Sequence, residues 1–423
     1  MTELKRTLGL PGLTFFGVGM ILGAGVYSVI GVAAARTGES LWVAFIIGGL
    51  AALFTALSYA ELAAMHPRAG AEFVYVREAF PRFEGLAAAC GLTLVLATCA
   101  TATTVALAFA GYLAELVEVP RMVIALAVLT AATAVNVIGI RHSTIVTAIF
   151  TVIEVAGLVL VIYLGATHEG FGRALLVAPD RGVLAGAALV FFAYLGFEEI
   201  ANLAEEAKDP GKTLPRAIFI SLAFTSVIYI LVALAVVALA VPAELAATDS
   251  PLAFAVSRAW PRVVPVLAGI ALFATANTAL ATMLTGSRML FGMARDGELP
   301  ATVARVIPVR GTPWVASLVV LAVAGALLPF GAIAIVAGVS SFGALLGFLL
   351  VNVCLIVLRR RAPDRKRPFR VPLAVGFVPV PAVLGVGACL ALLVSFEPVV
   401  YAAGGIALAL AVLVVATRRW WTR

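Results

Sequence analysis

Long apolar runs alternate with short polar segments along almost the whole chain. A helix that crosses a bilayer needs about 20 mostly apolar residues. The pattern predicts twelve such helices, over residues 12–35, 41–65, 85–114, 120–138, 143–165, 183–204, 215–240, 263–293, 314–330, 332–358, 376–395 and 398–417. None of these runs alternates between apolar and polar residues as a membrane barrel strand does. We therefore expect an all-α polytopic membrane protein that forms a single transmembrane domain.

Composition supports this prediction. The 423 residues are 63% hydrophobic and 12% charged, whereas soluble proteins carry roughly 25% charged residues. The mean hydropathy is +1.12. The four cysteines lie in apolar runs without C-x-x-C spacing, and the three histidines are scattered. Neither a disulfide framework nor a metal site is predicted.

The distribution of basic residues predicts the orientation. With twelve spans both termini share one side, and that side receives 23 of the 29 Lys and Arg residues. The positive-inside rule makes it the cytoplasmic side of the plasma membrane. The basic residues are spread over seven segments, so a nucleic-acid partner is not expected. The densest run, Arg359–Arg370, is expected to contact anionic lipid head groups.

The first and sixth spans contain glycines in mid-membrane. Span one reads GVGMILGAGVYSVIG, and span six reads FFAYLGFEEIANLAEE. Close helix packing through Gly19 and Gly23 is one interpretation. The other is a pair of interrupted helices at matching places in inverted repeats, over residues 12–165 and 183–358, followed by two extra helices over 376–417. Such interruptions point to a central site. Their free N–H groups suit a carboxylate and their free carbonyls suit an ammonium group.

Four stretches carry a family resemblance: LGLPGLTFFGVGMILGAGVY, SYAELAAMHPRAGAEFVYVREAF, FFAYLGFEEIANLAEEAKDPGKTLPRAI and GSRMLFGMARDGELP. Together, in this order and at the expected helix ends, they resemble the amino acid–polyamine–organocation transporter superfamily over nearly the whole chain. The resemblance implies a LeuT-like fold of five-plus-five inverted repeats with two additional helices. It also implies an amino acid as substrate. One departure is AGAEF, residues 69–73, where the family more often has two glycines.

The resemblance also implies a set of substrate-binding residues. Gly23, Ala24 and Gly25 match the unwound segment of span one, whose amides receive the substrate carboxylate. In span six, the matching carbonyls and pocket side chains are those of Phe191, Ala193, Tyr194, Gly196 and Phe197. Thr98 and Thr101 of span three are expected to complete the pocket wall.

Glu154 lies in the middle of span five, too far from either interface to reach water. A charged residue at this depth costs about 3 kcal/mol even on insertion scales. Several sodium-independent members of the superfamily carry a lysine near this point. We expect Glu154 to take up and release a proton, the alternatives being a neutral packing residue or a sodium ligand.

Other polar residues in the membrane are candidates for ion or substrate contact. Glu198 follows the span-six glycine, and it could be structural, part of a gate, or a contact for a cationic substrate. Thr275, Thr278 and Thr282 share one face of span eight. The alternative for these threonines is hydrogen bonding to their own helix.

The predicted function is secondary active amino acid transport by alternating access, coupled to protons. An exchanger of amino acids or amines without proton coupling is the alternative, followed by a sodium-coupled symporter. The chain has no H-E-x-x-H, G-x-S-x-G or Walker A sequence, so neither an enzyme nor an ATP-driven pump is predicted, and no cofactor is expected. A channel fits the paired interruptions less well than a gated carrier.

Overall fold

The computed structural model describes residues 8–67, 71–114, 118–138, 144–179, 182–204, 207–307 and 312–417. Some basic residues used above for the orientation lie outside the described residues: Lys5, Arg6, Arg68, Arg141, Arg181, Arg310, Arg418, Arg419 and Arg423. The same holds for Ala69 and Gly70 of the AGAEF stretch. Almost everything described is helical, and the expected all-α fold is confirmed.

Each of the twelve predicted spans coincides with a helix. Among the described residues, nine segments are long and apolar enough to cross a membrane; one of them, 10–65, holds two helices, and two shorter apolar helices complete the set. The helices are α1 (Leu10–Thr37), α2 (Leu41–Met65), α4 (Glu84–Ala114), α5 (Arg121–Ile138), α6 (Thr144–Ala166), α8 (Val183–Tyr194) with α9 (Glu199–Asn202), α10 (Pro210–Leu239), α13 (Val264–Arg295), α14 (Trp314–Leu327), α15 (Ile333–Arg361), α16 (Val380–Leu393) and α17 (Pro398–Thr417).

Several short elements were not predicted. They are α3 (Ala71–Ala79), α7 (Phe171–Ala174), α11 (Pro242–Ala246) and α12 (Pro251–Ala259). A hairpin of β1 (Ala374–Val375) and β2 (Val378–Pro379) precedes α16. The predicted start of that span at residue 376 is therefore wrong by four residues. The chain turns at Gly376, whose φ of +63° favours glycine, before the helix begins.

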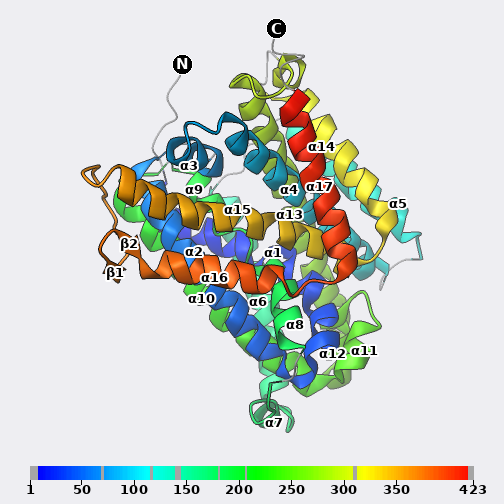
Figure 1. Ribbon diagram of the computed structural model, residues 1–423. Coiled ribbons are helices and arrows are strands. Elements are labelled where there is room, and N and C mark those ends of the chain that lie inside the picture. The colour runs from blue at the N-terminus through cyan, green and yellow to red at the C-terminus, as the bar shows by residue number, and fades with distance from the viewer. Residues whose placement is uncertain are drawn as a thin grey trace.

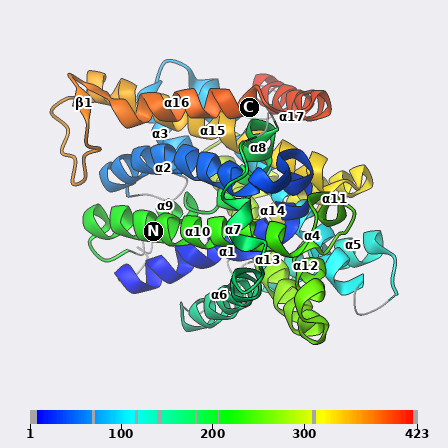
Figure 2. The same cartoon turned by 90° about the horizontal axis from the view of Figure 1, so that it is seen from below.

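Helix α1 lies at the centre of the bundle and packs against α6, α8 and α10. Helix α4 crosses α13 and α15 and also contacts α5 and α14. Figure 1 shows α5, α14 and α17 together at one side of the molecule. Figure 2 shows α16, α2 and α10 lying side by side. Large apolar side chains on the outward faces of α5, α6 and α17 are exposed, as a lipid-facing surface requires.

Candidate functional site

Helix α1 is interrupted at Gly23, where the backbone has φ −22° and ψ −133°. The amide of the next residue, Ala24, donates a 3.0 Å hydrogen bond to Thr278 Oγ1 on α13. That hydroxyl in turn donates to the carbonyl of Ala274 at 3.0 Å. A Cβ at position 23 would overlap Thr278 Oγ1. Glycine is therefore required at this break by contact with α13, and Thr278 satisfies one of the amides that the break exposes.

Span six is interrupted as well. Helix α8 ends at Tyr194, and Leu195 is extended. Gly196 has φ +123°, a backbone conformation that residues other than glycine rarely adopt. The Gly196 amide donates a 2.9 Å hydrogen bond to Glu198 Oε2, and α9 then begins at Glu199. The two interruptions that the sequence predicted are confirmed by the backbone.

The two breaks meet each other. A Cβ on Gly25 would lie 2.6 Å from Ala193 Cα, and one on Gly196 would lie 2.8 Å from the Met20 carbonyl oxygen. Only glycine allows the two backbones to approach this closely. The result is two interrupted helices in direct contact at the centre of the molecule.

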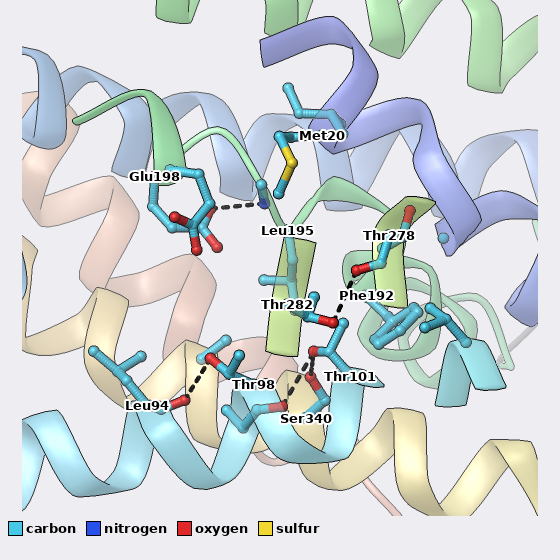
Figure 3. Close-up of a pocket in the computed structure, with 17 residues that line it drawn as sticks. Met20, Leu94, Thr98, Thr101, Phe192, Leu195, Glu198, Thr278, Thr282 and Ser340 are labelled. Atoms are coloured by element: carbon cyan, nitrogen blue, oxygen red, sulfur yellow. Dashed lines mark hydrogen bonds between the residues drawn. The ribbon is translucent and has the colours of Figure 1, made fainter. Parts of the chain in front are cut away.

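A cavity of about 70 Å³ lies beside these breaks. Figure 3 shows that its wall combines residues of the broken helices with residues of α4, α13 and α15. The polar part of the wall consists of Thr98, Thr101, Glu198, Glu199, Thr278, Thr282 and Ser340. The apolar part includes Met20, Leu94, Val105, Phe192, Leu195 and Ala344. The cavity has room for a few water molecules.

Two helices close one side of this cavity through paired hydroxyl groups. Thr101 of α4 and Ser340 of α15 lie 2.7 Å apart, oxygen to oxygen. Thr282 donates to the carbonyl of Thr278 within α13 at 2.8 Å. Ser340 was not identified from the sequence, because a serine in an apolar run has no local signature of its partner on another helix.

The cavity includes only part of the predicted site. Gly25, Gly196, Glu198, Thr278 and Thr282 line it. Gly23 and Ala24 do not line the cavity; they contact the Thr278 hydroxyl at the break in α1. Thr275 does not line the cavity, and its hydroxyl donates to the carbonyl of Ala271 in its own helix at 2.7 Å.

The aromatic side chains predicted for the pocket are buried away from this cavity. Phe191 and Phe197 pack edge-to-face or tilted on Phe348 of α15, with ring centroids 5.9 Å and 5.2 Å from it. The Tyr194 hydroxyl donates to the carbonyl of Phe45 at 2.8 Å. In this conformation Tyr194 therefore links the C-terminal end of α8 to α2 by a hydrogen bond.

Tyr229 of α10 was not identified from the sequence. It is fully buried, and its hydroxyl contacts the carbonyl of Ile21 in α1 and that of Ala193 in α8. Both carbonyls lie just before the interruption of their helix. A single side chain thus serves the two carbonyl ends of the interrupted helices. One tyrosine among several in apolar spans carries no sign of this role in the sequence.

Glu154 of α6 is fully buried next to the break in α1. The hydroxyl of Tyr27, just beyond the break, lies 3.4 Å from the Glu154 main-chain carbonyl. Neither carboxyl oxygen has a hydrogen-bond partner among the described residues, although the side chain of Asn277 on α13 is close by. Asn277 adjoins Thr278 in sequence, so the carboxyl group is near the polar contacts of the α1 break without joining them.

Buried polar groups also lie at the C-terminal end of α2, which is the end opposite to α7. Glu72 of α3 is 4% exposed and accepts a 2.8 Å hydrogen bond from the Tyr59 hydroxyl. Burial raises the pKa of Glu72 above its ordinary value of 4.5, and the hydrogen bonds from its backbone and from Tyr59 offset part of this rise. Burial, with the nearby charge of Glu72, also raises the pKa of Tyr75 well above 10.0.

Glu61, the last carboxylate of α2, organises the arginine-rich segment 359–371. It accepts a 2.9 Å hydrogen bond from Arg359 Nε and a 3.1 Å bond from Arg367 Nε. The Val371 amide donates to the same carboxylate at 2.7 Å. Arg367 also donates to the carbonyls of Leu358 and Ala362, which ends α15. Part of the predicted lipid-binding run is therefore used inside the protein.

Comparison with known proteins agrees with this architecture. The amino acid permease family profile matches residues 8–417. The branched-chain amino acid permease BcaP of Bacillus subtilis is 30% identical over 93% of this chain and 88% of its own. An uncharacterised transporter of Mycobacterium tuberculosis is 34% identical over 100% of this chain and 93% of its own. The vacuolar cationic amino acid transporter 4 of Arabidopsis thaliana is 34% identical over 86% of this chain and 64% of its own. No group of three His, Cys, Asp or Glu residues suited to a metal occurs among the described residues.

Proposed function

The chain belongs to the amino acid permease family, and on this premise we propose that it carries an amino acid between the interrupted segments of α1 and α8–α9 by alternating access. The observation that supports the proposal most directly is the contact of the two breaks, Gly25 against Ala193. Irregular backbone is tolerated at this depth only where it lines a cavity or is buried in protein. Its presence beside a cavity favours a ligand site.

The electrostatics of the breaks suit a zwitterion. The second half of α1 starts at the break, and its N-terminal amides carry partial positive charge that favours the substrate carboxylate. The carbonyls of Ile21 and Ala193 end the preceding half-helices and favour the ammonium group. Their contact with the Tyr229 hydroxyl supports this assignment, because both carbonyls accept from a group outside their own helix. One amino acid can then interact with both ends at once.

The small size of the cavity is consistent with a proposed alternating-access cycle. A space of about 70 Å³ is too small to admit an amino acid freely from either side. We propose that the wall opens for entry and again for release by movement of the broken helices. We propose that residues 12–165 and 183–358 act as inverted repeats around this site, in a LeuT-like arrangement. In the proposed orientation both termini face the cytoplasm and the membrane is the plasma membrane.

We further propose that Glu154 couples transport to a proton. Its carboxyl group is fully buried beside the uncharged side chain of Asn277, a setting in which a neutral, protonated group is cheaper than a charged one. It adjoins the α1 break through Tyr27 and Asn277. A change at the break would alter its access to water, and hence its protonation. Exchange without proton coupling is the second candidate, and sodium coupling the third.

Uptake of labelled amino acids into proteoliposomes tests the proposal. Wild type and Glu154→Gln are compared with and without an inward proton gradient, first without sodium and then with it. We expect the gradient to drive accumulation in wild type, and the glutamine variant to exchange substrate without being driven. A wild type that ignores the gradient, with equal exchange by both proteins, would support the exchanger. Stimulation by sodium alone would support the symporter.

A matched control separates coupling from packing. Thr275→Val changes another buried polar group whose hydroxyl bonds only within its own helix. It should leave the response to the proton gradient intact. If Thr275→Val and Glu154→Gln lose the gradient response equally, the effect belongs to helix packing and the proton role of Glu154 is refuted.

A further inference from the structure

The basic residues at the end of α15 and in the segment that follows it fall into two groups, one bonded within the protein and one exposed. Residues 359–370 include seven basic residues and one acidic residue, Asp364. Four of the seven are used within the protein, by hydrogen bonds to Glu61, Glu78 and main-chain carbonyls: Arg359, Arg361, Arg365 and Arg367. The other three, Arg360, Lys366 and Arg370, are exposed and form no ion pair with a described residue.

The hairpin that follows carries apolar side chains on its surface. Leu373 and Val375 are each 75% exposed, and Phe377 is 45% exposed. Leu373 has φ +58°, which is rare for a residue with a branched side chain. Figure 1 shows the β1–β2 hairpin projecting at the edge of the molecule, beyond the end of α15. A projecting group of exposed apolar residues is typical of an interaction surface.

The position of the hairpin relative to the bilayer identifies the partner. It joins two apolar helices, α15, which ends at Arg361, and α16, which begins at Val380. The 18 residues between them therefore begin and end near the membrane surface. The Arg360 guanidinium lies 5.8 Å from the centre of the Phe377 ring, so a basic group and an apolar group share one face. Apolar side chains with adjacent cations are the pattern of segments that bind anionic lipid surfaces.

We propose that the hairpin is an interfacial anchor. Leu373, Val375 and Phe377 enter the head-group region of the adjacent leaflet, and Arg360, Lys366 and Arg370 contact anionic lipid head groups there. The inference rests on membrane embedding alone and is independent of the substrate and of proton coupling.

The anchor is fixed to the helix bundle. Two residues before Leu373, the Val371 amide donates to Glu61 at 2.7 Å, and the Val371 carbonyl accepts from Arg359 at 2.9 Å. These bonds tie the start of the hairpin to the ends of α2 and α15. The start of the hairpin is therefore held in place at the ends of both helices, next to the buried Glu61–Arg359 pair.

An environment-sensitive fluorophore tests the anchor directly. Val375→Cys is labelled with a nitrobenzoxadiazole group in nanodiscs of phosphatidylcholine, alone or with about one third phosphatidylglycerol. The four native cysteines are buried and should label poorly. Leu176→Cys is the control, because Leu176 is 86% exposed and lies near α7, at the opposite end of α2. We expect a blue shift at position 375 in the anionic lipid, quenching by spin-labelled lipid, and neither change at position 176.

Charge removal distinguishes lipid recognition from simple burial. Adding Lys366→Gln and Arg370→Gln to the labelled protein should raise the phosphatidylglycerol fraction needed for the half-maximal shift several-fold, since each basic residue near the surface contributes to binding. Salt should weaken the response of the charged protein. An emission maximum typical of water in both lipids would overturn the anchor. A shift that is the same in both lipids, or unchanged by the two substitutions, would overturn anionic lipid recognition.

Discussion

The hydroxyl group of Tyr229 donates a 2.8 Å hydrogen bond to the main-chain carbonyl of Ala193. The same hydroxyl also contacts the carbonyl of Ile21. A tyrosine hydroxyl has one hydrogen, so it can satisfy one carbonyl fully or share its hydrogen between the two. A substrate ammonium group that donates to one of them would let Tyr229 serve the other. If substrate binds at the breaks as proposed, Tyr229 can shift its hydrogen bond between the two carbonyls.

Replacing Tyr229 by Phe should weaken substrate binding as well as folding. The variant leaves two buried carbonyls without this donor, at a cost of about 1–3 kcal/mol. We expect the KM for uptake to rise roughly tenfold or more, with the protein still monodisperse in detergent. Tyr163→Phe is the control, because Tyr163 is 64% exposed on α6. An unchanged KM in Tyr229→Phe would show that the hydroxyl has no part in ordering the site.

Replacing Gly25 by Ala should block transport by separating the broken helices. The added Cβ would lie 2.6 Å from Ala193 Cα, a main-chain atom that cannot move without shifting α8. We expect uptake and substrate-induced thermal stabilisation to be lost together. Both are measured on purified protein, the second by the shift of the unfolding temperature with added amino acid.

Gly269→Ala provides the matched control on α13. A Cβ at that position meets no atom within 4 Å, and alanine favours helix over glycine by about 1 kcal/mol. This variant should transport normally. If Gly25→Ala also transported normally, the close approach of α1 and α8 would not be needed for function.

The positions of the helices could be predicted from the sequence because their signal is local. Apolar runs of the required length marked all twelve spans, and the glycine–carboxylate pattern after Tyr194 marked the second interruption. The first interruption at Gly23 was identified by its pairing with the second, since glycines alone also fit helix packing. Unpaired backbone at mid-membrane depth is rare enough that two such sites at matching positions are informative.

The contacts around the breaks could not be predicted, because they join residues far apart in sequence. Ala24 and Thr278 are 254 residues apart, and Glu61 and Arg359 are 298 apart. Nothing local to Tyr229 indicates that it serves two carbonyls. The arginine run likewise read as one basic surface, whereas the fold buries Arg359 beside a carboxylate.

The Glu61–Arg359 pair should contribute strongly to stability. Both side chains are almost completely buried, at 0% and 2% exposed. Glu61→Gln leaves the Arg359 and Arg367 charges without their carboxylate, and removing one partner of a buried pair costs about 3–5 kcal/mol. We expect a clear fall in the unfolding temperature of the purified protein, measured by fluorescence-detected size exclusion after heating.

Glu78→Gln is the corresponding control for a surface pair. Glu78 and Arg365 are 43% and 39% exposed, and such pairs contribute roughly 0–1 kcal/mol. Its unfolding temperature should remain close to that of wild type. Equal effects of Glu61→Gln and Glu78→Gln would mean that burial of the α2–α15 pair adds nothing to stability.

Glu72 should make the stability of the protein depend on pH. Burial raises its pKa in the folded state above the ordinary value of 4.5, so between these two values the folded protein binds more protons than the unfolded chain. Stability therefore falls as pH rises above about 4.5 and through the raised pKa, because the carboxylate must then be charged in a buried setting. The titratable groups near it are the hydroxyls of Tyr59 and Tyr75, the Cys90 thiol of α4, and the carboxyl groups of Glu198 and Glu199.

Glu72→Gln should flatten this dependence while keeping an acceptor for the Tyr59 hydroxyl. We expect its unfolding temperature to fall less than that of wild type over the same rise in pH, and to exceed it at the upper end. Glu39→Gln, at an exposed position, should retain the wild-type profile. The measurement is the unfolding temperature at a series of pH values in one detergent. Parallel profiles for wild type and Glu72→Gln would show that the proton taken up on folding resides elsewhere.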